Sequence, residues 1–244
     1  MNIISIHFWR NLSLISAVLL LSLLLLASII ALLVFIIRKP IRKYKYKDVA
    51  IFERLQKHTS PSRNRVMLFI TLLAKHQFLI PANSILIIYF LFINKQSWFS
   101  IRIAAIALSS LVLMLLLKIL FKRKRPLAPL LKAAKGLSFP SGHAIMAVTF
   151  YGVIIYILAH IVNNEWLLYF FSAVLIILML LIGFSRVYLR VHYVSDVIAG
   201  FIIGILWLYI SLLVLNRMEK YIKENNRVIF QTSLLKEGFQ PPVF

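Results

Sequence analysis

The sequence contains no cysteine and only seven acidic residues among its 244 positions. The absence of cysteine excludes disulfide bonds, thiol catalysis and cysteine-ligated metals. Against these few carboxylates stand 28 Lys and Arg, which give a formal net charge of +21 at pH 7. Such an excess can indicate nucleic-acid binding, but here the cations lie beside long apolar runs. We therefore expect anionic lipid headgroups and phosphorylated substrates as partners, and no nucleic acid.

Apolar residues are abundant: 61% of the chain is hydrophobic and its mean hydropathy is +0.91, whereas soluble domains are about half apolar. A membrane-spanning helix needs about 20 apolar residues. Runs of that order occur near 12–37, 78–94, 101–121, 143–162, 166–185 and 193–215. Backbone polar groups in lipid must bond internally, and continuous apolar runs suit helices rather than barrel strands. The predicted fold is therefore all-α, a polytopic membrane protein with a six-transmembrane-helix bundle and short interfacial helices.

Polar segments divide the chain into three parts. Residues 1–64 are predicted to be an uncleaved N-terminal anchor span followed by a basic interfacial segment, in which 48–58 form either a weak amphipathic surface helix or a solvated linker. Residues 65–216 form the core with five spans, and 65–77 are either interfacial or an early turn of the second span. Residues 217–244 are a polar C-terminal tail with no assigned function.

The first of three polar clusters lies at the end of the third span, where Lys118 is followed by Arg125-Pro126 in the loop. A phosphate dianion is held by several fixed donors; lysine supplies a point charge and arginine a planar fork. Basic residues also flank many spans simply as anchors. By itself, this cluster fits a phosphate site and an anchor equally well.

The second cluster, Pro140-Ser141-Gly142-His143, stands directly before the fourth span. Serine at this place can be an ordinary N-cap. The unpaired N–H groups of a helix start also bind anions, and glycine lets an oxygen approach the backbone closely. His143 is placed either to donate a proton to a leaving oxygen or to serve a structural role at the helix end.

The third cluster joins Ser185-Arg186 to His192 and Asp196. His192 and Asp196 are four residues apart, so they share one face of a helix. Asp196 is the only acidic residue within the six predicted spans, and an ionisable group inside a membrane indicates a functional site. Its carboxylate would fix one imidazole nitrogen of His192 and leave the other free to attack. The alternative is a helix-capping salt bridge.

The six-span topology places all three clusters together. Loops after the first, third and fifth spans emerge on the same face of the membrane, so residues far apart in sequence are predicted to meet at one surface. The clusters resemble the tripartite signature of the type 2 phosphatidic acid phosphatase superfamily, to which the soluble vanadium haloperoxidases are related. The signature reads KILFKRKRP at 118–126, PSGH at 140–143 and SRVYLRVHYVSD at 185–196.

This resemblance implies a phosphatase that uses neither a metal nor another cofactor; the six spans argue against haloperoxidase chemistry. By motif matching, it implies that His192 is a nucleophile that forms a phosphohistidine, that Asp196 orients it, and that His143 protonates the leaving group. The residues that would hold the phosphoryl oxygens are Lys118, Arg125, Ser141, Gly142 and Arg186.

The position of the site at headgroup level predicts a lipid substrate whose tail stays in the bilayer. Phosphatidic acid, phosphatidylglycerophosphate and polyprenyl diphosphate all fit. Two alternatives remain: a lipid phosphotransferase that uses the same site, and a non-catalytic lipid-binding protein with a degenerate site. The intact His143, His192 and Asp196 argue against the second.

Loop charges and family resemblance disagree about orientation. The motif-bearing side carries eighteen Lys and Arg and the opposite side eight. Cytoplasmic loops usually carry the excess, which would place the site in the cytoplasm, whereas members of the family usually face outward or toward a lumen. We expect a multi-pass protein of a bacterial inner (plasma) membrane with its site on the outer face.

Overall fold

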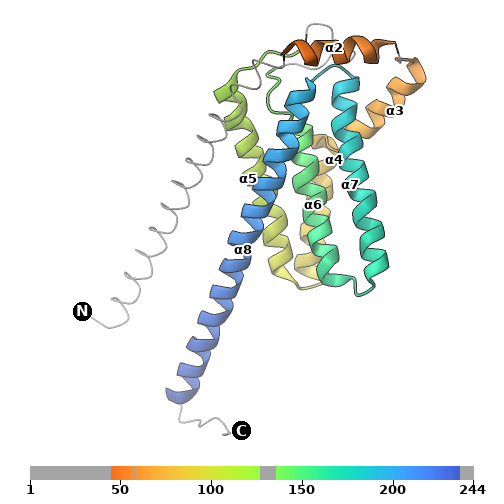
Figure 1. Ribbon diagram of the computed structural model, residues 1–244. Coiled ribbons are helices and arrows are strands. Elements are labelled where there is room, and N and C mark those ends of the chain that lie inside the picture. The colour runs from red at the N-terminus through yellow and green to blue at the C-terminus, as the bar shows by residue number, and fades with distance from the viewer. Residues whose placement is uncertain (1–44, 58, 127–135, 237–244) are drawn as a thin grey trace.

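A computed structural model describes residues 45–57, 59–126 and 136–236 of the chain. The elements are, in order, α2 (Lys45–Gln56), α3 (Pro61–Leu72), α4 (His76–Ile88), the π-helical η1 (Tyr89–Ile93), α5 (Ser97–Phe121), α6 (Gly142–Ile161), α7 (Glu165–Tyr188) and α8 (Val194–Lys236) (Figure 1). The described residues form no β-strand. The predicted all-α class is confirmed.

Five stretches of the described residues are long and apolar enough to cross a membrane: Pro61–Ile93, Ser97–Phe121, Gly142–Ile161, Glu165–Tyr188 and Val194–Asn225. They correspond to the last five of the six predicted spans. The predicted first span, 12–37, lies outside the described residues. Helix α8 continues beyond the end of its apolar run, so the first part of the predicted polar tail is helical as far as Lys236.

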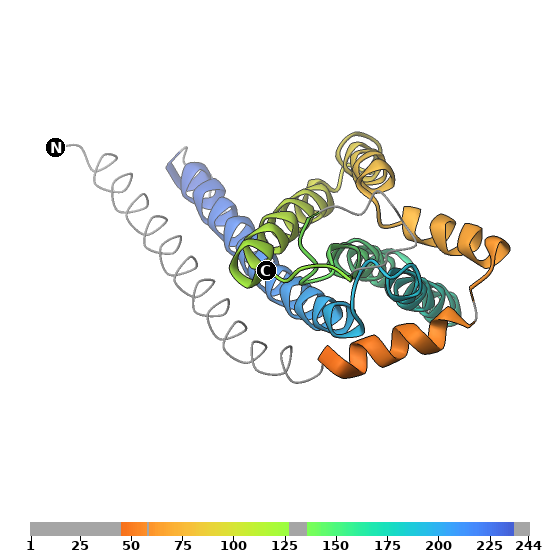
Figure 2. The same cartoon turned by 90° about the horizontal axis from the view of Figure 1, so that it is seen from above.

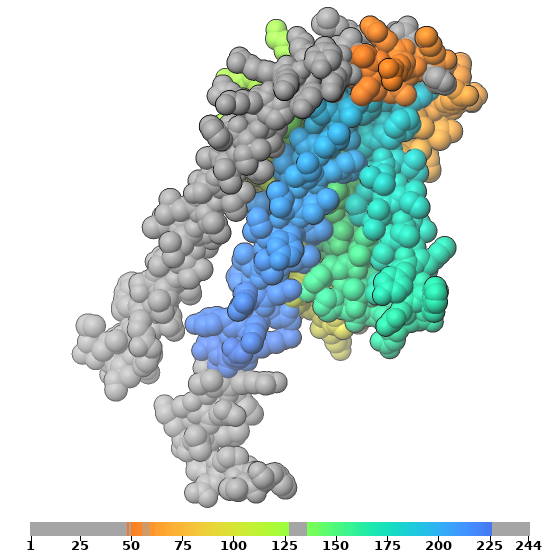
Figure 3. Space-filling view, viewed as in Figure 1, coloured from red at the N-terminus to blue at the C-terminus, as the bar shows by residue number. Residues whose placement is uncertain are grey.

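The segments before the second span are both helical. Residues 48–58 fall largely within α2, which lies across one end of the bundle (Figures 1 and 3) and contacts α7. Residues 65–77 cover most of α3 and the break at 73–75 that separates it from α4. Helix α3 packs against α7, whereas α4 packs against α5. The chain therefore changes neighbours at that break: 65–72 belong to the separate helix α3, and only 76–77 belong to the first turn of α4.

Helix α6 is the centre of the bundle, because it packs against α5, α7 and α8 (Figure 2). The side chains that face away from the bundle are large and apolar: Ile80 on α4, Leu108 on α5, Phe170 on α7 and Ile205 on α8 each expose more than half of their surface. Apolar groups exposed at this density need a lipid solvent rather than water. The protein is thus a multi-pass membrane protein.

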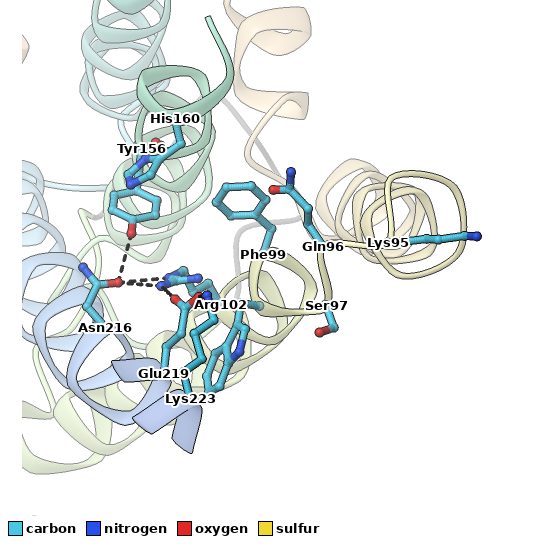
Figure 4. Close-up of a pocket in the computed structure, with 11 residues that line it drawn as sticks. Lys95, Gln96, Ser97, Phe99, Arg102, Tyr156, His160, Asn216, Glu219 and Lys223 are labelled. Atoms are coloured by element: carbon cyan, nitrogen blue, oxygen red, sulfur yellow. Dashed lines mark hydrogen bonds and ion pairs between the residues drawn. The ribbon is translucent and has the colours of Figure 1, made fainter. Parts of the chain in front are cut away.

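Polar contacts tie the helices together at the end of the bundle where α5 begins and α6 ends. There the buried Arg102 of α5 donates to Oδ1 of Asn216 from Nε at 3.1 Å and forms an ion pair with Glu219 (Figure 4). The hydroxyl of Tyr156 on α6 donates to the same Asn216 oxygen at 2.9 Å. These groups line a cavity of about 550 Å³. Because its guanidinium is paired there, Arg102 is accommodated in a largely apolar bundle.

Candidate active site

The opposite end of the bundle collects the residues that the sequence singled out. Six of the eight line one cavity of about 530 Å³: Lys118, Arg125, Gly142, His143, Arg186 and His192. They come from the end of α5, the start of α6, the end of α7 and the loops that follow α5 and α7. The other two, Ser141 and Asp196, have no exposed surface and are adjacent to the residues that line it. The prediction that the three clusters meet at one end of the bundle is therefore confirmed.

The carboxylate of Asp196 lies beside the Nδ1 edge of the His192 ring. Nδ1 of His192 lies 3.7 Å from Oδ2 of Asp196, and both side chains are almost completely buried. The same Asp196 oxygen accepts hydrogen bonds from the hydroxyl of Ser138 and from the backbone N–H of Tyr193, the latter at 2.9 Å. Since Asp196 is held on several sides, it can orient the imidazole and leave Nε2 as the nitrogen available for chemistry.

The environment of His192 keeps its ring neutral. Burial lowers the pKa of His192 from 6.5 to about 4; the neighbouring carboxylate of Asp196 opposes this shift and the charge of Arg186 adds to it. At neutral pH the imidazole therefore carries a free lone pair, which is the form that a nucleophile requires.

Backbone carbonyls of nearby loops hold two of the cations in place. Nζ of Lys118 donates to the carbonyl of Leu137 at 2.9 Å, and Nη1 of Arg125 donates to the carbonyl of Val191 at 3.0 Å. Burial lowers the pKa of Arg125 from its usual value, and the charge of Asp196 opposes that shift. Because neither cation has a carboxylate within ion-pair distance in the described residues, their positive charge is directed to the cavity rather than neutralised.

Two donors at the cavity are buried and unused. Within the described part of the chain, Oγ of Ser141 and Nε of Arg186 have no hydrogen-bond partner. Arg186 is anchored at its other end, where Nη1 donates to Oγ1 of Thr71 on α3 at 2.6 Å. Ser141 is also the N-cap of α6, whose first N–H groups lack intrahelical partners. Buried donors without acceptors are costly, so the site is suited to an anion that would satisfy them.

The two histidine-bearing segments are linked through their backbones. The N–H of Ser141 donates to the carbonyl of Asp196 at 3.1 Å. Just beyond, α8 approaches α6 at Gly200, where an added Cβ would lie 2.9 Å from the carbonyl oxygen of Ser141. This close approach fixes the distance between the start of α6, with His143, and the start of α8, with Asp196.

Four further residues belong to the site but were not singled out from the sequence. Arg123 forms ion pairs with Asp196 and, at 2.9 Å, with Asp48 of α2. Ser195 donates to Asp48 from its hydroxyl at 2.6 Å, and Ser138 donates to Asp196. A sequence signal existed for Asp48, because it is one of only seven acidic residues and stands in a strongly basic stretch. Arg123 lies among four consecutive cations, where sequence cannot tell which side chain turns inward.

Comparisons with known proteins agree with this geometry. The PAP2 superfamily matches residues 99–220. Phosphatidylglycerophosphatase B from Bacillus subtilis (strain 168) is 33% identical over 168 residues, which are 67% of this chain and 80% of that protein. The crystal structure of a transmembrane PAP2 type phosphatidylglycerolphosphate phosphatase from Bacillus subtilis has a TM-score of 0.70 at 30% identity, covering 77% of this chain and 94% of that one. The structure of LpxE from Aquifex aeolicus has a TM-score of 0.50 at 28% identity and covers 67% and 93%.

Proposed function

This chain belongs to the PAP2 superfamily, and from that premise we propose that it releases phosphate from a lipid phosphate through a phosphohistidine intermediate. Family membership makes the chain a membrane-bound lipid phosphatase; the proposal adds the covalent step, the roles of the residues and the substrate. The observation that carries it is a cavity whose lining joins three cations and two signature histidines to a long apolar wall: Lys118, Arg125, Arg186, His143 and His192.

The apolar wall supports a substrate with a lipid tail. From the cationic end the cavity continues between α4, α5 and α6, where its lining includes Leu79, Ile80, Leu86, Ile87 and Ile103. A phosphate held by the cations would leave its hydrocarbon chain along this wall, where burial of apolar surface is favourable. A curated relative and a similar solved structure, both from Bacillus subtilis, are named for phosphatidylglycerophosphate. We therefore propose this lipid as the first substrate, with phosphatidic acid and polyprenyl diphosphate as alternatives.

In the first step, Nε2 of the neutral His192 attacks phosphorus. The new P–N bond forms as the P–O bond to the lipid breaks, and His143 gives its proton to the departing oxygen. Lys118, Arg125 and Arg186 balance the negative charge on the non-bridging oxygens, and Ser141 and Gly142 contribute donors at the start of α6. Positioning and electrostatic stabilisation of this kind provide most of the catalysis in phosphoryl transfer.

In the second step, water replaces the histidine. His143, now without its proton, takes a proton from a water molecule whose oxygen attacks phosphorus. The P–N bond breaks, its electron pair returns to Nε2 of His192, and inorganic phosphate leaves. Asp196 keeps its contact with Nδ1 throughout, so the ring stays in one orientation and one tautomer.

Phosphate release from purified protein in detergent tests the function. The substrates are phosphatidylglycerophosphate, phosphatidic acid and polyprenyl diphosphate, and His192→Ala is expected to abolish release from all of them. The matched control is His160→Ala, which removes a histidine at the opposite end of the bundle and should leave release unchanged. Full activity in His192→Ala would refute the nucleophile assignment. Consumption of lipid phosphate without release of inorganic phosphate would favour the phosphotransferase, and no turnover by the wild type would favour the non-catalytic lipid-binding protein.

We also propose that the site faces outward across a bacterial inner membrane. Helix α8 runs from the site to the opposite end of the bundle (Figure 1), so a reporter fused to the C-terminus marks the other face. A green fluorescent protein fusion is expected to fluoresce in the cytoplasm, and an alkaline phosphatase fusion to be inactive. The reverse result would place the active site in the cytoplasm, as the loop charges indicate.

A further inference from the structure

Helix α2 carries a carboxylate, that of Asp48, which is buried rather than exposed to solvent. Asp48 is 3% exposed, although α2 lies across the end of the bundle (Figure 3). Its Oδ1 accepts from the N–H of Ser195 at 3.1 Å and its Oδ2 from the Ser195 hydroxyl at 2.6 Å. One turn later Phe52 is also buried, with its ring 5.6 Å from that of Tyr193. Helix α2 is therefore fastened to the segment that carries His192 and Asp196.

Arg123 extends this contact to the catalytic carboxylate. One terminal nitrogen of its guanidinium meets Oδ2 of Asp48 at 2.9 Å; the other meets Oδ1 of Asp196 and, at 2.8 Å, the hydroxyl of Ser195. The guanidinium also lies 4.1 Å from the ring centre of Tyr193. A planar fork can join two carboxylates in this way, whereas a lysine offers only a point charge.

We propose that Asp48 and Arg123 are positioning residues, which hold Asp196 and thereby fix the ring of His192 for attack. The inference rests on the proposed function and deepens it. Asp48 and Arg123 do not line the cavity, so they act on the nucleophile and not on the bound substrate. Helix α2 is then part of the catalytic unit, although it precedes every signature residue in the sequence.

A positioning role predicts a specific kinetic pattern. Small misplacements of a catalytic group cost up to about 100-fold in rate, so Asp48→Asn and Arg123→Gln are each expected to lower kcat by about 10- to 100-fold. KM and the inhibition constant of inorganic phosphate should stay within about twofold, because Lys118, Arg125 and Arg186 remain in place. Arg123→Lys should restore only part of kcat, because it keeps the charge but loses the fork.

The experiment measures phosphate release in detergent micelles, with the full chain, from phosphatidylglycerophosphate, phosphatidic acid and polyprenyl diphosphate. The variants are compared on the lipid that the wild type hydrolyses fastest. Glu53→Gln is the matched control for Asp48→Asn, since it removes an exposed carboxylate from the same helix. Lys124→Gln is the control for Arg123→Gln, since it removes an exposed cation one residue away. Both controls should keep the wild-type kcat. The fraction of folded protein is measured for each variant by thermal unfolding, and kcat is expressed per folded molecule.

Three results would overturn the inference. The first is an unchanged kcat per folded molecule in Asp48→Asn and Arg123→Gln, which would mean that the contacts only hold α2 in place. The second is an equal loss in the control variants, and the third is a rise in KM that accounts for the whole loss of activity. A wild-type protein that releases no phosphate from any of the three lipids would instead refute the proposed function, so the two failures can be told apart.

Discussion

Because α8 approaches α6 closely at Gly200, we predict that a larger side chain at this position lowers both stability and kcat. In Gly200→Ala the new Cβ would lie 2.9 Å from the Ser141 carbonyl oxygen and 2.9 Å from Cβ of Ala144, whereas ordinary contacts begin at 3.4 Å. The Ser141 oxygen is a backbone atom and cannot rotate away. The two helices must therefore move apart by about half an ångström. Overpacking of this kind costs about 1–3 kcal/mol of stability.

We expect Gly200→Ala to lower kcat by more than its loss of stability alone would cause. Because the shift falls where Ser141 bonds to Asp196, it moves His143 relative to His192. A displacement of about 1 Å can cost about 100-fold in rate, so half of that distance should lower kcat by about tenfold. The assays are phosphate release in detergent and thermal unfolding of the same samples.

A second glycine on the same pair of helices provides the control. In Gly152→Ala the new Cβ would lie 2.3 Å from Cδ2 of Leu208, and its other neighbour, Cγ of the same side chain, is at an ordinary 3.7 Å. Cδ2 is the end of a flexible side chain and can move away. Gly152→Ala should therefore lose less stability than Gly200→Ala and keep the wild-type kcat. The reasoning fails if Gly200→Ala matches the wild type in both assays, or if Gly152→Ala loses as much activity.

Three further predictions concern pH, metals and the far end of the bundle. Because the pKa of His192 falls from 6.5 to about 4 on folding, the unfolded state binds an extra proton between these values. The contribution of His192 should therefore make stability fall as the pH is lowered from 6.5 toward 4. Denaturant unfolding at several pH values should show this slope, and a slope of the same size in His192→Asn would refute it. Phosphate release should persist in excess chelator; its loss would refute a metal-independent reaction. Arg102→Leu should cost about 1–3 kcal/mol of stability, because Asn216 and Glu219 lose a charged hydrogen-bond donor, yet leave kcat unchanged. A stability equal to that of the wild type would show that these contacts of Arg102 contribute nothing.

Much of this architecture was predictable, because a lipid solvent leaves the chain few options. Backbone groups in the bilayer must bond within the segment, so long apolar runs such as 143–162 become helices; α6 spans Gly142–Ile161. The gathering of Lys118, His143 and His192 followed from the even number of spans between them: none between Lys118 and His143, and two between His143 and His192. Neither argument needs side-chain detail, and both agree with the structure.

Contacts of α2 were not predictable from the sequence. The spacing of Val49, Phe52 and Leu55 indicates an amphipathic helix equally for a membrane surface and for a protein surface, and a basic stretch favours the former. Helix α2 packs on protein because Asp48 contacts Ser195 and Arg123, which are 147 and 75 residues away in the chain. Local patterns carry no information about pairs at such separations.

Helix α8 reaches well past the hydrocarbon layer. Its 43 residues correspond to about 65 Å at 1.5 Å per residue, roughly twice the thickness of the apolar core of a bilayer. Because its first turn carries Asp196, the surplus length projects on the side away from the phosphate cavity (Figure 1). The C-terminal part of α8 therefore extends beyond the membrane on the side opposite the phosphate cavity. A fusion or surface attachment made at that end would immobilise the protein without contacting the residues of the cavity.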